Sequence, residues 1–448
     1  MSKKTYYLVS LGCAKNTVDS HSMAALLDQA GYKGVDQPVQ AEVLVVNTCG
    51  FIKPAADESI SVLKDLGKKK RRDQLLIAAG CLTERYREKI VELVPAVDGI
   101  IGTRRWMDIV DVIQQTRQER PQRTLYHLPD TPTVGVDETG VLRAARQGGS
   151  AYIKIADGCR RPCAFCAIPL IKGKNVSRPV DAILSEARLL QEQGVQEIIL
   201  IAQDTTDYGQ DLGLKEGLAH LLERLVTEVP EIPWVRILYA YPGYVTDRLI
   251  DVMAAHPQIL PYLDMPLQHA HPQTLRRMRR PANMDWVYRT LDKMRTRIPG
   301  LALRTTFIVG YPGETDEEYQ TLLDFIQAIR FDHVGAFMFS FEPGTTSEAL
   351  GDPVSAALKQ ERMEQLMLLQ QNISLANNQA LVGKTLDVLV EGYNDGISVG
   401  RSYRDAPEID GLVFLDGQAP VGEIVKAQIS GALTHDLTGT LIPMQTQV

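Results

Sequence analysis

Residues 158–166 read Gly-Cys-Arg-Arg-Pro-Cys-Ala-Phe-Cys, so three cysteines, Cys159, Cys163 and Cys166, stand at a C-x3-C-x2-C spacing. The loop directly follows the apolar run 151–156, which predicts a strand. Three thiolates can hold three irons of a 4Fe–4S cubane, whose usual complement is four cysteines, and one iron then stays open for chemistry. The alternatives are a zinc site and three unrelated buried thiols. Structural zinc takes four closed ligands, and no fourth Cys or His follows within several dozen residues, so the spacing favours a cluster.

Length and composition indicate an ordinary globular protein of about three domains. The chain has 448 residues, of which 44% are apolar and 23% charged, and no apolar run approaches the roughly 20 residues of a membrane span. Six cysteines in a chain of this length, without a secretory signal, argue against a disulfide framework. We therefore expect a cytoplasmic protein with reduced thiols and no membrane association.

Charge is distributed unevenly along the chain. The formal net charge is −7, which gives no support for a general nucleic-acid binder. Most of the excess lies in residues 378–448, where four basic residues face nine acidic ones: Lys384, Arg401, Arg404 and Lys426 against Asp387, Glu391, Asp395, Asp405, Glu408, Asp410, Asp416, Glu423 and Asp436. The C-terminal part is therefore the acidic part of the molecule.

The first 115 or so residues alternate apolar runs with amphipathic segments. Strands are expected at 6–10, 43–47 and 75–79, followed by a helix at about 17–30, a helix opened by Pro54 and a helix capped by Thr83. This β-α-β alternation predicts a doubly wound parallel sheet over residues 4–116.

The other three cysteines, Cys13, Cys49 and Cys81, each follow one of these strands. Sites in open parallel sheets form at the carboxyl ends of the strands, so the three thiols can converge although they are far apart in sequence. Three buried cysteines are the simpler alternative, because free cysteine is among the most buried residue types. Their equivalent positions favour a second cluster with an open iron.

Residues 117–149 lose this periodicity and gather Pro, Gly and Thr, which predicts a linker. Residues 150–350 then repeat a strand-helix unit six times, and an incomplete (β/α)6 barrel is expected. The expected strands are 152–156, 197–202, 234–240, 263–266, 302–309 and 334–340, with helices such as 180–193 and 317–330 between them.

Polar or glycine residues stand at the carboxyl ends of the barrel strands, where barrels of this type carry their chemistry. They are Gln203, the pair Gln268-His269 and the segment 310–314. Arg304, on the fifth strand, is expected to pair with a carboxylate. The basic run 276–280 either lines a route to an anionic substrate or forms an exposed helix face.

The last part of the chain has a different secondary-structure pattern from the strand-helix repeat before it. A long helix is expected over 355–381, followed by short strands at 386–390, 397–400, 412–415 and 423–429 with Gly, Asn-Asp and Pro turns between them. This pattern predicts a small all-β barrel.

The central loop, with Phe165 just before its last cysteine, resembles the signature of radical S-adenosylmethionine (SAM) enzymes. The resemblance implies the same incomplete barrel over residues 150–375. It also implies that SAM chelates the open iron and is split to a 5′-deoxyadenosyl radical. Residues 308–314 resemble the superfamily's adenine-flanking segment, although Thr306 stands where glycine is frequent. The candidate cofactor-binding residues are Phe165, Gln203, Arg304, Gly310 and Glu314.

Over nearly its full length the chain resembles the methylthiotransferases of this superfamily. These have an N-terminal domain with three dispersed cysteines, a radical-SAM core and a C-terminal TRAM domain, here 378–446. Residues 81–86, 268–272 and 400–411 are most similar to the members that modify an aspartate of the small-subunit ribosomal protein uS12. The resemblance implies two 4Fe–4S clusters, one SAM that methylates a sulfur, and a second that yields the radical abstracting hydrogen from the aspartate β-carbon. It also implies a low-potential electron donor such as a flavodoxin or ferredoxin.

The acidic C-terminal barrel fits a basic protein substrate, since an RNA-binding surface would be basic. We expect Asp405, Glu408 and Asp410 to attract that substrate. Two alternatives stay open: a tRNA adenosine methylthiotransferase with the same machinery, and a non-catalytic iron–sulfur protein that carries electrons or senses oxygen. Nothing in the sequence requires more than a monomer.

Overall fold

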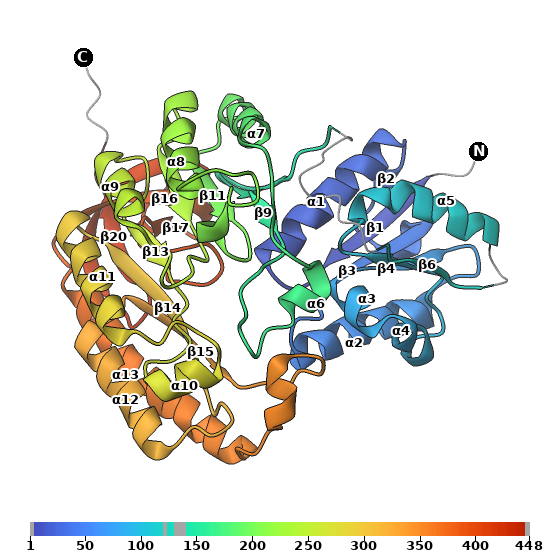
Figure 1. The fold of residues 1–448 in the computed structure, drawn as a ribbon. Coiled ribbons are helices and arrows are strands. Elements are labelled where there is room, and N and C mark those ends of the chain that lie inside the picture. The colour runs from blue at the N-terminus through green and yellow to red at the C-terminus, as the bar shows by residue number, and fades with distance from the viewer. Residues whose placement is uncertain (1–3, 120–122, 130–139, 444–448) are drawn as a thin grey trace.

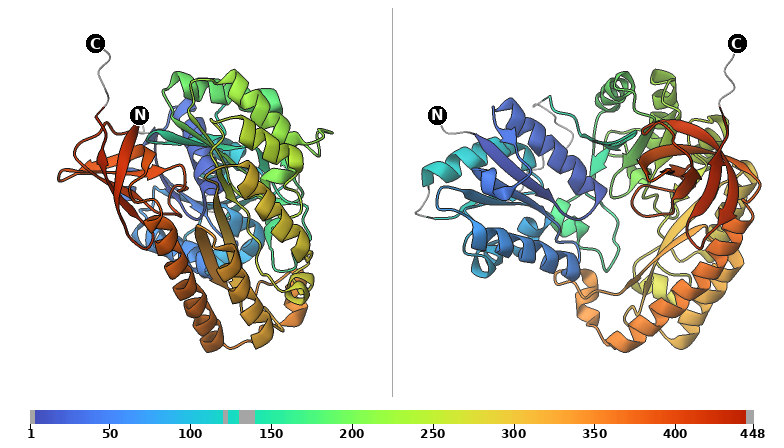
Figure 2. Two further views of the ribbon diagram at one scale, coloured as in Figure 1. Left: turned by 90° about the vertical axis from the view of Figure 1, so that its left-hand side faces the viewer. Right: turned by 180° about the vertical axis from the view of Figure 1, so that it is seen from behind.

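The computed structural model describes residues 4–119, 123–129 and 140–443, which form three units in chain order (Figure 1). Seen from behind, the C-terminal barrel lies against the central unit, and the N-terminal sheet lies on the other side (Figure 2). Among the described residues, no helix combines the length and apolar character needed to cross a membrane.

The first unit is a six-stranded parallel sheet in the order β2-β1-β3-β4-β5-β6. Its strands are β1 (Thr5–Ser10), β2 (Lys33–Gly34), β3 (Val43–Thr48), β4 (Leu75–Gly80), β5 (Gly99–Gly102) and β6 (Leu125–His127). Its helices are α1 (Ala14–Gln29), η1 (Pro38–Gln40), α2 (Lys53–Lys69), α3 (Cys81–Tyr86), α4 (Glu88–Leu93), η2 (Trp106–Asp108) and α5 (Ile109–Glu119).

Successive side chains along β3 point to opposite faces of the sheet, and apolar residues on both faces explain why helices cover both. Val43 and Val45 pack in one core with α1 and α5, whereas Leu44 and Val46 pack in a second core with α2 and α4. All six residues of β3 are buried as a result, which is typical of parallel strands covered on both sides. The predicted doubly wound sheet is confirmed.

Two predicted helix starts in this unit are wrong. Helix α1 begins at Ala14 with Cys13 as its N-cap, not at about residue 17. Thr83 lies inside α3 rather than capping it, because its hydroxyl donates to the carbonyl oxygens of Gly80 and Ile101, at 2.7 and 2.9 Å. A cysteine therefore stands at the start of each helix, Cys13 as the N-cap of α1 and Cys81 as the first residue of α3.

The central unit is the predicted incomplete barrel. Its parallel strands are β8 (Ser150–Lys154), β11 (Glu197–Ile201), β12 (Trp234–Ile237), β13 (Tyr262–Asp264), β14 (Ala302–Val309) and β15 (His333–Met338). They form the sheets β12-β11-β8 and β13-β14-β15. Backbone hydrogen bonds from Leu260 to Val235 and from Ala240 to Asp264, both 2.9 Å, join the two. In the described part of the chain β15 pairs with β14 alone, so the barrel stays open.

Helices cover the outside of this barrel (Figure 1). They are α7 (Val180–Glu192), α8 (Gly217–Glu228), α9 (Asp247–Ala255), α10 (Pro272–Arg277), α11 (Met284–Arg297) and α12 (Asp316–Ile329). Shorter elements lie on its loops: β9 (Ala156–Asp157), α6 (Ile168–Lys172), β10 (Val176–Ser177), η3 (Thr205–Asp207) and η4 (Thr346–Leu350).

The expected linker, 117–149, contains regular structure. Helix α5 continues to Glu119, β6 extends the first sheet, and β7 (Ala144–Gln147) pairs antiparallel with β8. These strands are three and four residues long, too short to show a periodicity of their own. Residues 120–122 and 130–139 of the expected linker lie outside the described residues.

Helix α13 (Ala356–Gln379), capped by the Ser355 hydroxyl, leads into the predicted β-barrel. The barrel is closed in the order β16-β17-β18-β20-β19, with strands β16 (Thr385–Asn394), β17 (Ile397–Ser402), β18 (Val413–Asp416), β19 (Ile424–Ala432) and β20 (Leu437–Leu441). The fifth strand, β20, was not predicted. It closes the barrel by pairing with both β18 and β19. Residues 444–446 of the expected domain lie outside the described residues.

Candidate active site

The three-cysteine loop leaves β8 and β9 at the carboxyl end of the barrel and is held by backbone contacts. The Cys159 amide donates to Gly173 at 3.0 Å, and the Ala164 amide donates to Met278 at 2.9 Å. Gly158 has φ +79°, and a Cβ there would collide with the Lys174 carbonyl, so a side chain at this position would push the loop away. The loop is therefore fixed before any cofactor binds.

All three thiols of this loop line one cavity, which lies at the carboxyl ends of the strands. The side chains around them can donate hydrogen bonds to sulfur: Arg280 Nη1 lies 3.5 Å and the Tyr241 hydroxyl 3.7 Å from Cys163 Sγ. Burial raises the pKa of Cys159 to about 11 and that of Cys166 to about 12. In the absence of a metal these thiols keep their protons, and metal binding would release them.

The lining of the cavity also carries buried polar atoms that have no hydrogen-bond partner among the described residues. They include Gln203 Oε1 and Arg280 Nε. Buried polar groups are almost always paired, so unpaired ones that line a cavity indicate a polar ligand. A cavity lined both by three thiols and by unpaired polar atoms fits a metal cluster with a polar cofactor beside it.

The second trio also meets at strand ends. Cys13 caps α1 after β1, Cys49 follows β3, and Cys81 opens α3 after β4. A Cβ at Gly12, where φ is +93°, would stand 2.8 Å from Cys49 Cβ. Only glycine therefore lets the segment after β1 approach the segment after β3 this closely.

Asn16 joins the three strand ends of this trio. Its side-chain amide donates to the carbonyl oxygens of Leu11 and Thr48, at 2.9 and 3.1 Å, and its Oδ1 lies 3.6 Å from Cys81 Sγ. One buried side chain thus contacts the segments that carry all three cysteines. The sequence analysis missed Asn16, although its place three residues after Cys13 puts it in the first turn of α1.

The three thiols of this trio have different acidities. Burial raises the pKa of Cys49, and raises that of Cys81 to about 12. At Cys13 the loss of water also raises the pKa, but the Lys15 ammonium and backbone N–H groups of Asn16 and Lys15 outweigh it, so the pKa of Cys13 lies below its ordinary value. Cys13 is therefore the readiest thiolate of this trio.

In the described part of the chain no three His, Cys, Asp or Glu side chains are placed to hold a single metal ion. A mononuclear zinc site needs ligands that converge on one point, whereas an iron–sulfur cluster binds each thiolate at a different iron, so its ligands surround a volume. The three thiols of the central loop, which line one cavity, can surround such a volume.

The two trios are neighbours. Cys81 packs against Ala167 and Ile171, which directly follow the central cysteine loop. Buried charges reinforce this contact: Lys172 lies 3.3 Å from Asp19 of α1 and 3.1 Å from Asp157 of β9. Lys154 contacts the same two carboxylates. The distance between the trios is thus set by the protein itself.

The sequence-predicted cofactor residues fall in two places. Phe165 and Gln203 line the cavity, and Gln203 also donates to Asp157 at 3.0 Å. Gly310 and Glu314 are not among the lining residues. The Glu314 carboxylate accepts from the Gly310 amide at 3.1 Å and pairs with Arg362 of α13 at 2.6 Å, so this segment is held against α13.

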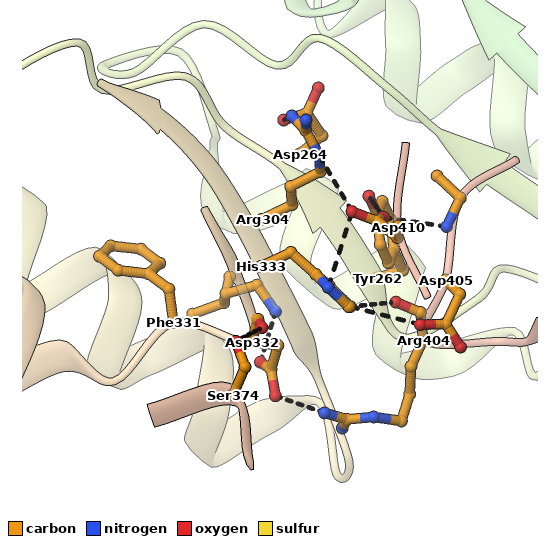
Figure 3. A network of polar contacts seen from close by, with 12 residues as sticks. Tyr262, Asp264, Arg304, Phe331, Asp332, His333, Ser374, Arg404, Asp405 and Asp410 are labelled. Carbon is orange, nitrogen blue, oxygen red and sulfur yellow. Dashed lines mark hydrogen bonds and ion pairs between the residues drawn. The ribbon is translucent and has the colours of Figure 1, made fainter. Parts of the chain in front are cut away.

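Arg304 does pair with carboxylates, as expected, but away from the cavity. It lies 3.1 Å from Asp264 of the barrel and 3.2 Å from Asp410 of the C-terminal unit (Figure 3). His333 Nδ1 lies 3.6 Å from the same Asp410 carboxylate. These contacts attach the C-terminal barrel to the amino ends of β13, β14 and β15.

Of the three acidic residues expected to attract the substrate, two belong to this attachment. The Asp410 side chain is 1% exposed and that of Asp405 is 8% exposed, and both face His333 (Figure 3). Burial of this kind leaves them no surface for a partner protein, whereas Glu408 is exposed. The sequence could not show this, because their partners lie 70 or more residues away.

Two residues that line the cavity have unusual backbone conformations; Gln268 stands at a strand end already singled out from the sequence, whereas Tyr239 was not predicted. Tyr239, at the end of β12, has φ 64°, and Gln268, after β13, has φ 74°. Non-glycine residues in this region are uncommon and concentrate at functional sites. Of the basic run 276–280, Arg276 and Arg279 are exposed, Arg277 pairs with Glu318 of α12, and Arg280 is buried and lines the cavity.

Comparisons with known proteins match this architecture unit by unit. The radical SAM superfamily model covers residues 153–326, a TRAM domain model covers 382–442, and the model of an uncharacterized family, UPF0004, covers 5–102. The radical SAM methyltransferase TsrM from Kitasatospora setae, solved with cobalamin and a [4Fe-4S] cluster, has a similar fold. The TM-score is 0.59 at 14% identity, over 89% of this chain and 81% of that one. An incomplete barrel with a three-cysteine loop and this superfamily match define a radical SAM protein.

Relatives that match this chain over nearly its full length identify the family within the radical SAM proteins. The ribosomal protein uS12 methylthiotransferase RimO of Chloroflexus aurantiacus is 46% identical over 97% of this chain and 99% of its own length. That of Microcystis aeruginosa is 43% identical over 98% of this chain and its whole length. The chain belongs to the family of ribosomal protein uS12 methylthiotransferases. The predicted enzyme class is confirmed, as are its cofactors, SAM and two 4Fe–4S clusters.

Proposed function

We propose that this protein adds a methylthio group to the β-carbon of an aspartate in uS12, with Cys159, Cys163 and Cys166 holding the cluster that binds SAM. Cys13, Cys49 and Cys81 hold the second cluster. The observation that carries this assignment is the contact between the two trios through Cys81, Ala167 and Ile171. When bound, the clusters and SAM supply the radical and the sulfur that substitution at an unactivated carbon requires.

The chain's own contribution is to hold the groups and exclude water. Arg280, beside Cys163, gives the cavity wall a positive charge, whereas the charge of Arg161 is paired with Asp204 and Asp207. An anionic group of the cofactor, such as the SAM carboxylate, would find its counter-charge there. The unpaired Gln203 Oε1 is an acceptor for its ammonium or hydroxyl groups.

A fixed distance between the trios is the second contribution. Asp19, Asp157, Lys154 and Lys172 are all buried and join α1 to the central unit. The Arg85 side chain, buried against Glu342 at 2.7 Å, makes a further contact between the two units. Correct placement of reacting groups can remove several kcal/mol from a barrier, about 7–11 in the best cases.

The C-terminal barrel supports a basic protein as the substrate. Arg401 and Arg404, two of its four basic residues, are buried, whereas Asp387, Glu391, Asp395, Glu408, Asp416 and Glu423 are exposed. The accessible surface of this barrel is thus more acidic than the overall count of its charged residues indicates. Such a surface repels RNA and attracts a basic ribosomal protein.

The decisive experiment incubates the anaerobically reconstituted enzyme with SAM, a reductant and either purified uS12 or total tRNA. Mass spectrometry should find a methylthio-sized mass gain on one aspartate of uS12 and no new methylthio nucleoside in tRNA. Modification of a tRNA adenosine instead would overturn the substrate assignment and leave the cluster assignment standing. Formation of 5′-deoxyadenosine in neither reaction would overturn the cluster assignment, and an electron-carrier role would then gain support.

Several further parts of the proposal concern the setting of the reaction. A low-potential donor such as a flavodoxin or ferredoxin would reduce the clusters, the protein would act in the cytoplasm with its ribosomal substrate, and a monomer would suffice. We divide the chain into domains at 4–116, 150–375 and 378–446. The pairing of β6 with the first sheet and of β7 with the second supports assigning most of the described part of 117–149 to the neighbouring domains.

A further inference from the structure

Lysines at the contact between the two trios differ in their partners. Lys154 and Lys172 each contact two carboxylates, those of Asp19 and Asp157. Lys15, two residues after Cys13, pairs with no carboxylate among the described residues. Its ammonium instead stands over the ring of Tyr239, 3.3 Å from the ring centroid. Part of the Lys15 side chain remains accessible.

Tyr239 is held firmly in its strained conformation. Its amide donates to Asp264 Oδ2 at 3.3 Å, and its carbonyl accepts from the amide and the hydroxyl of Thr205, at 3.1 and 3.2 Å. Surrounding contacts of this kind are needed to maintain a positive φ in a non-glycine residue. The conformation places one aromatic ring against both the cavity with the central cysteines and the first turn of α1.

We propose that Lys15 binds the side-chain carboxylate of the substrate aspartate, and so positions its β-carbon between the two cysteine trios. This inference rests on the proposed function. The reaction needs an aspartate at this contact, and a carboxylate entering a water-poor site needs a cation. Lys15 is the lysine there that has no carboxylate within ion-pair distance among the described residues, and the Tyr239 ring holds its ammonium without supplying a formal negative charge.

The alternative role of the Lys15 charge is to stabilise the second cluster. Lys15 lies beside Cys13 in sequence, and an ammonium could serve only to offset the charge of a thiolate-bound cluster. The two uses differ in one measurable respect. A lysine that binds the substrate distinguishes aspartate from asparagine, whereas a lysine that serves only the cluster does not.

The test measures binding of two uS12 peptides to the reconstituted enzyme by fluorescence anisotropy. One peptide carries the target aspartate and the other has asparagine in its place. Wild type should bind the aspartate peptide about tenfold more tightly, the effect of one charged hydrogen bond, and Lys15→Gln should bring the ratio close to one. Lys15→Arg should restore part of the preference. Lys174→Gln, the same change at an exposed lysine near the central loop, is the control and should keep the full ratio.

A second measurement covers the case in which Lys15→Gln loses iron from the second cluster. A carbodiimide joins a carboxylate to an amine only where the two are in contact. Applied to the wild-type holoenzyme with the aspartate peptide, it should give a cross-link to Lys15 that mass spectrometry can locate.

The possible failures are distinguishable. A Lys15→Gln enzyme that keeps both its clusters and the aspartate preference would overturn the inference, and so would a wild type that binds both peptides alike or forms no Lys15 cross-link. A wild type that binds and modifies neither peptide nor intact uS12 would overturn the proposed function instead.

Discussion

At the scale of single residues, the two cysteine trios present their sulfurs differently. Those of the central loop lie together on one cavity wall, supplied by eight consecutive residues. The sulfurs of the N-terminal trio come from three strand ends, and their placement depends on Gly12 and Asn16. The first trio is therefore built by local geometry, and the second by the fold of a whole sheet.

Single cysteine substitutions should separate the two sites. Cys163→Ala removes one of the three thiols that we assign to the cluster that binds SAM, and 5′-deoxyadenosine formation should fall to background. Cys49→Ala should still form 5′-deoxyadenosine but lose methylthio transfer, because the sulfur-bearing site is incomplete. Liquid chromatography with mass spectrometry measures both products, and each variant should contain about half of the wild-type iron. Methylthio transfer by Cys49→Ala would show that the sulfur comes from another source.

Asn16→Ala should impair the second site without removing a ligand. It leaves the Leu11 and Thr48 carbonyls without the amide they share and frees the three strand ends to separate. Loss of a buried hydrogen-bonding side chain costs about 1–3 kcal/mol, so the sheet should fold but hold its cluster loosely. Iron content and the cluster's absorbance during chelator challenge are the measurements. Asn372→Ala, on the exposed side of α13, is the matched control and should lose iron no faster than wild type.

The difference between the locally built central trio and the N-terminal trio, which depends on the whole sheet, decides how much of the site could be predicted from the sequence. Cysteine spacing is a local signal, and strand ends are found from apolar runs, so all six cysteines could be placed from the sequence. The roles of Asp405 and Asp410 could not, because burial against His333 and Arg304 depends on contacts across more than 70 residues. The positive φ of Tyr239 and of Gln268 carries no sequence signal, since such a conformation in a non-glycine residue is imposed by its surroundings.

At the scale of elements, the turn after β14 is held by the helix that follows the barrel. Glu314 binds the Gly310 amide on one side and Arg362 of α13 on the other. Gly310 has φ +69°, and a Cβ there would collide with the Lys359 side chain of α13. The close fit between turn and helix fixes the end of the barrel's longest strand.

Glu314→Ala should therefore act on stability. Among the described residues it leaves the solvent-exposed Asp316 carboxylate as the remaining ion-pair partner of Arg362, which is 3% exposed. Removing one member of a buried ion pair typically costs about 3–5 kcal/mol. Chemical denaturation of the apo-protein measures this loss, and Glu317→Ala on the exposed start of α12 is the control. Unchanged stability together with weakened SAM binding would instead favour the cofactor role expected from the sequence.

Helices and strands whose apolar residues recur with a clear period were predicted from the sequence, and those without such a period were not. The six barrel strands and the helices between them repeat on a scale that apolar patterning reveals. Strands β6, β7 and β20 each have three to five residues and gain their stability from pairing with distant strands. For such short segments the partner, rather than the segment's own sequence, decides the structure.

At the scale of the whole molecule, buried ion pairs hold the C-terminal barrel on the central one. Glu197, at the start of β11, lies 2.7 Å from both Arg236 of the central barrel and Arg401 of the C-terminal barrel. All three side chains are at most 1% exposed. The C-terminal barrel is thus a fixed part of the structure, and its acidic surface keeps a constant position relative to the active site.

This attachment should weaken in acid. Although burial alone would raise it, Arg236 and Arg401 lower the pKa of Glu197 from its ordinary 4.5 to about 2. A depressed pKa contributes stability above 4.5 that is lost as the pH falls toward 2. Glu197→Gln should lower the melting temperature at neutral pH, and its difference from wild type should shrink across that window. A difference that does not vary with pH would show that Glu197 is not ionised in the folded protein.

The exposed carboxylates of the C-terminal barrel should govern how fast and how tightly a basic substrate is captured. Asp395 and Asp416 are exposed at one end of the barrel, where the Gly417 amide donates to the Gly396 carbonyl at 2.9 Å. Replacing both with lysine changes the net charge of the barrel from −5 to −1 and should weaken uS12 binding about tenfold at low ionic strength.

The loss should diminish as salt is added, because these charges are exposed and screened within about 10 Å at 0.1 M. Surface plasmon resonance at several salt concentrations would measure it, with 5′-deoxyadenosine formation in the absence of uS12 as the reference for intact clusters. Thr440→Ala, an exposed change on β20 that alters no charge, is the control. Equal affinity of the lysine variant and wild type at low salt would mean that uS12 is captured elsewhere, at the active-site cleft itself.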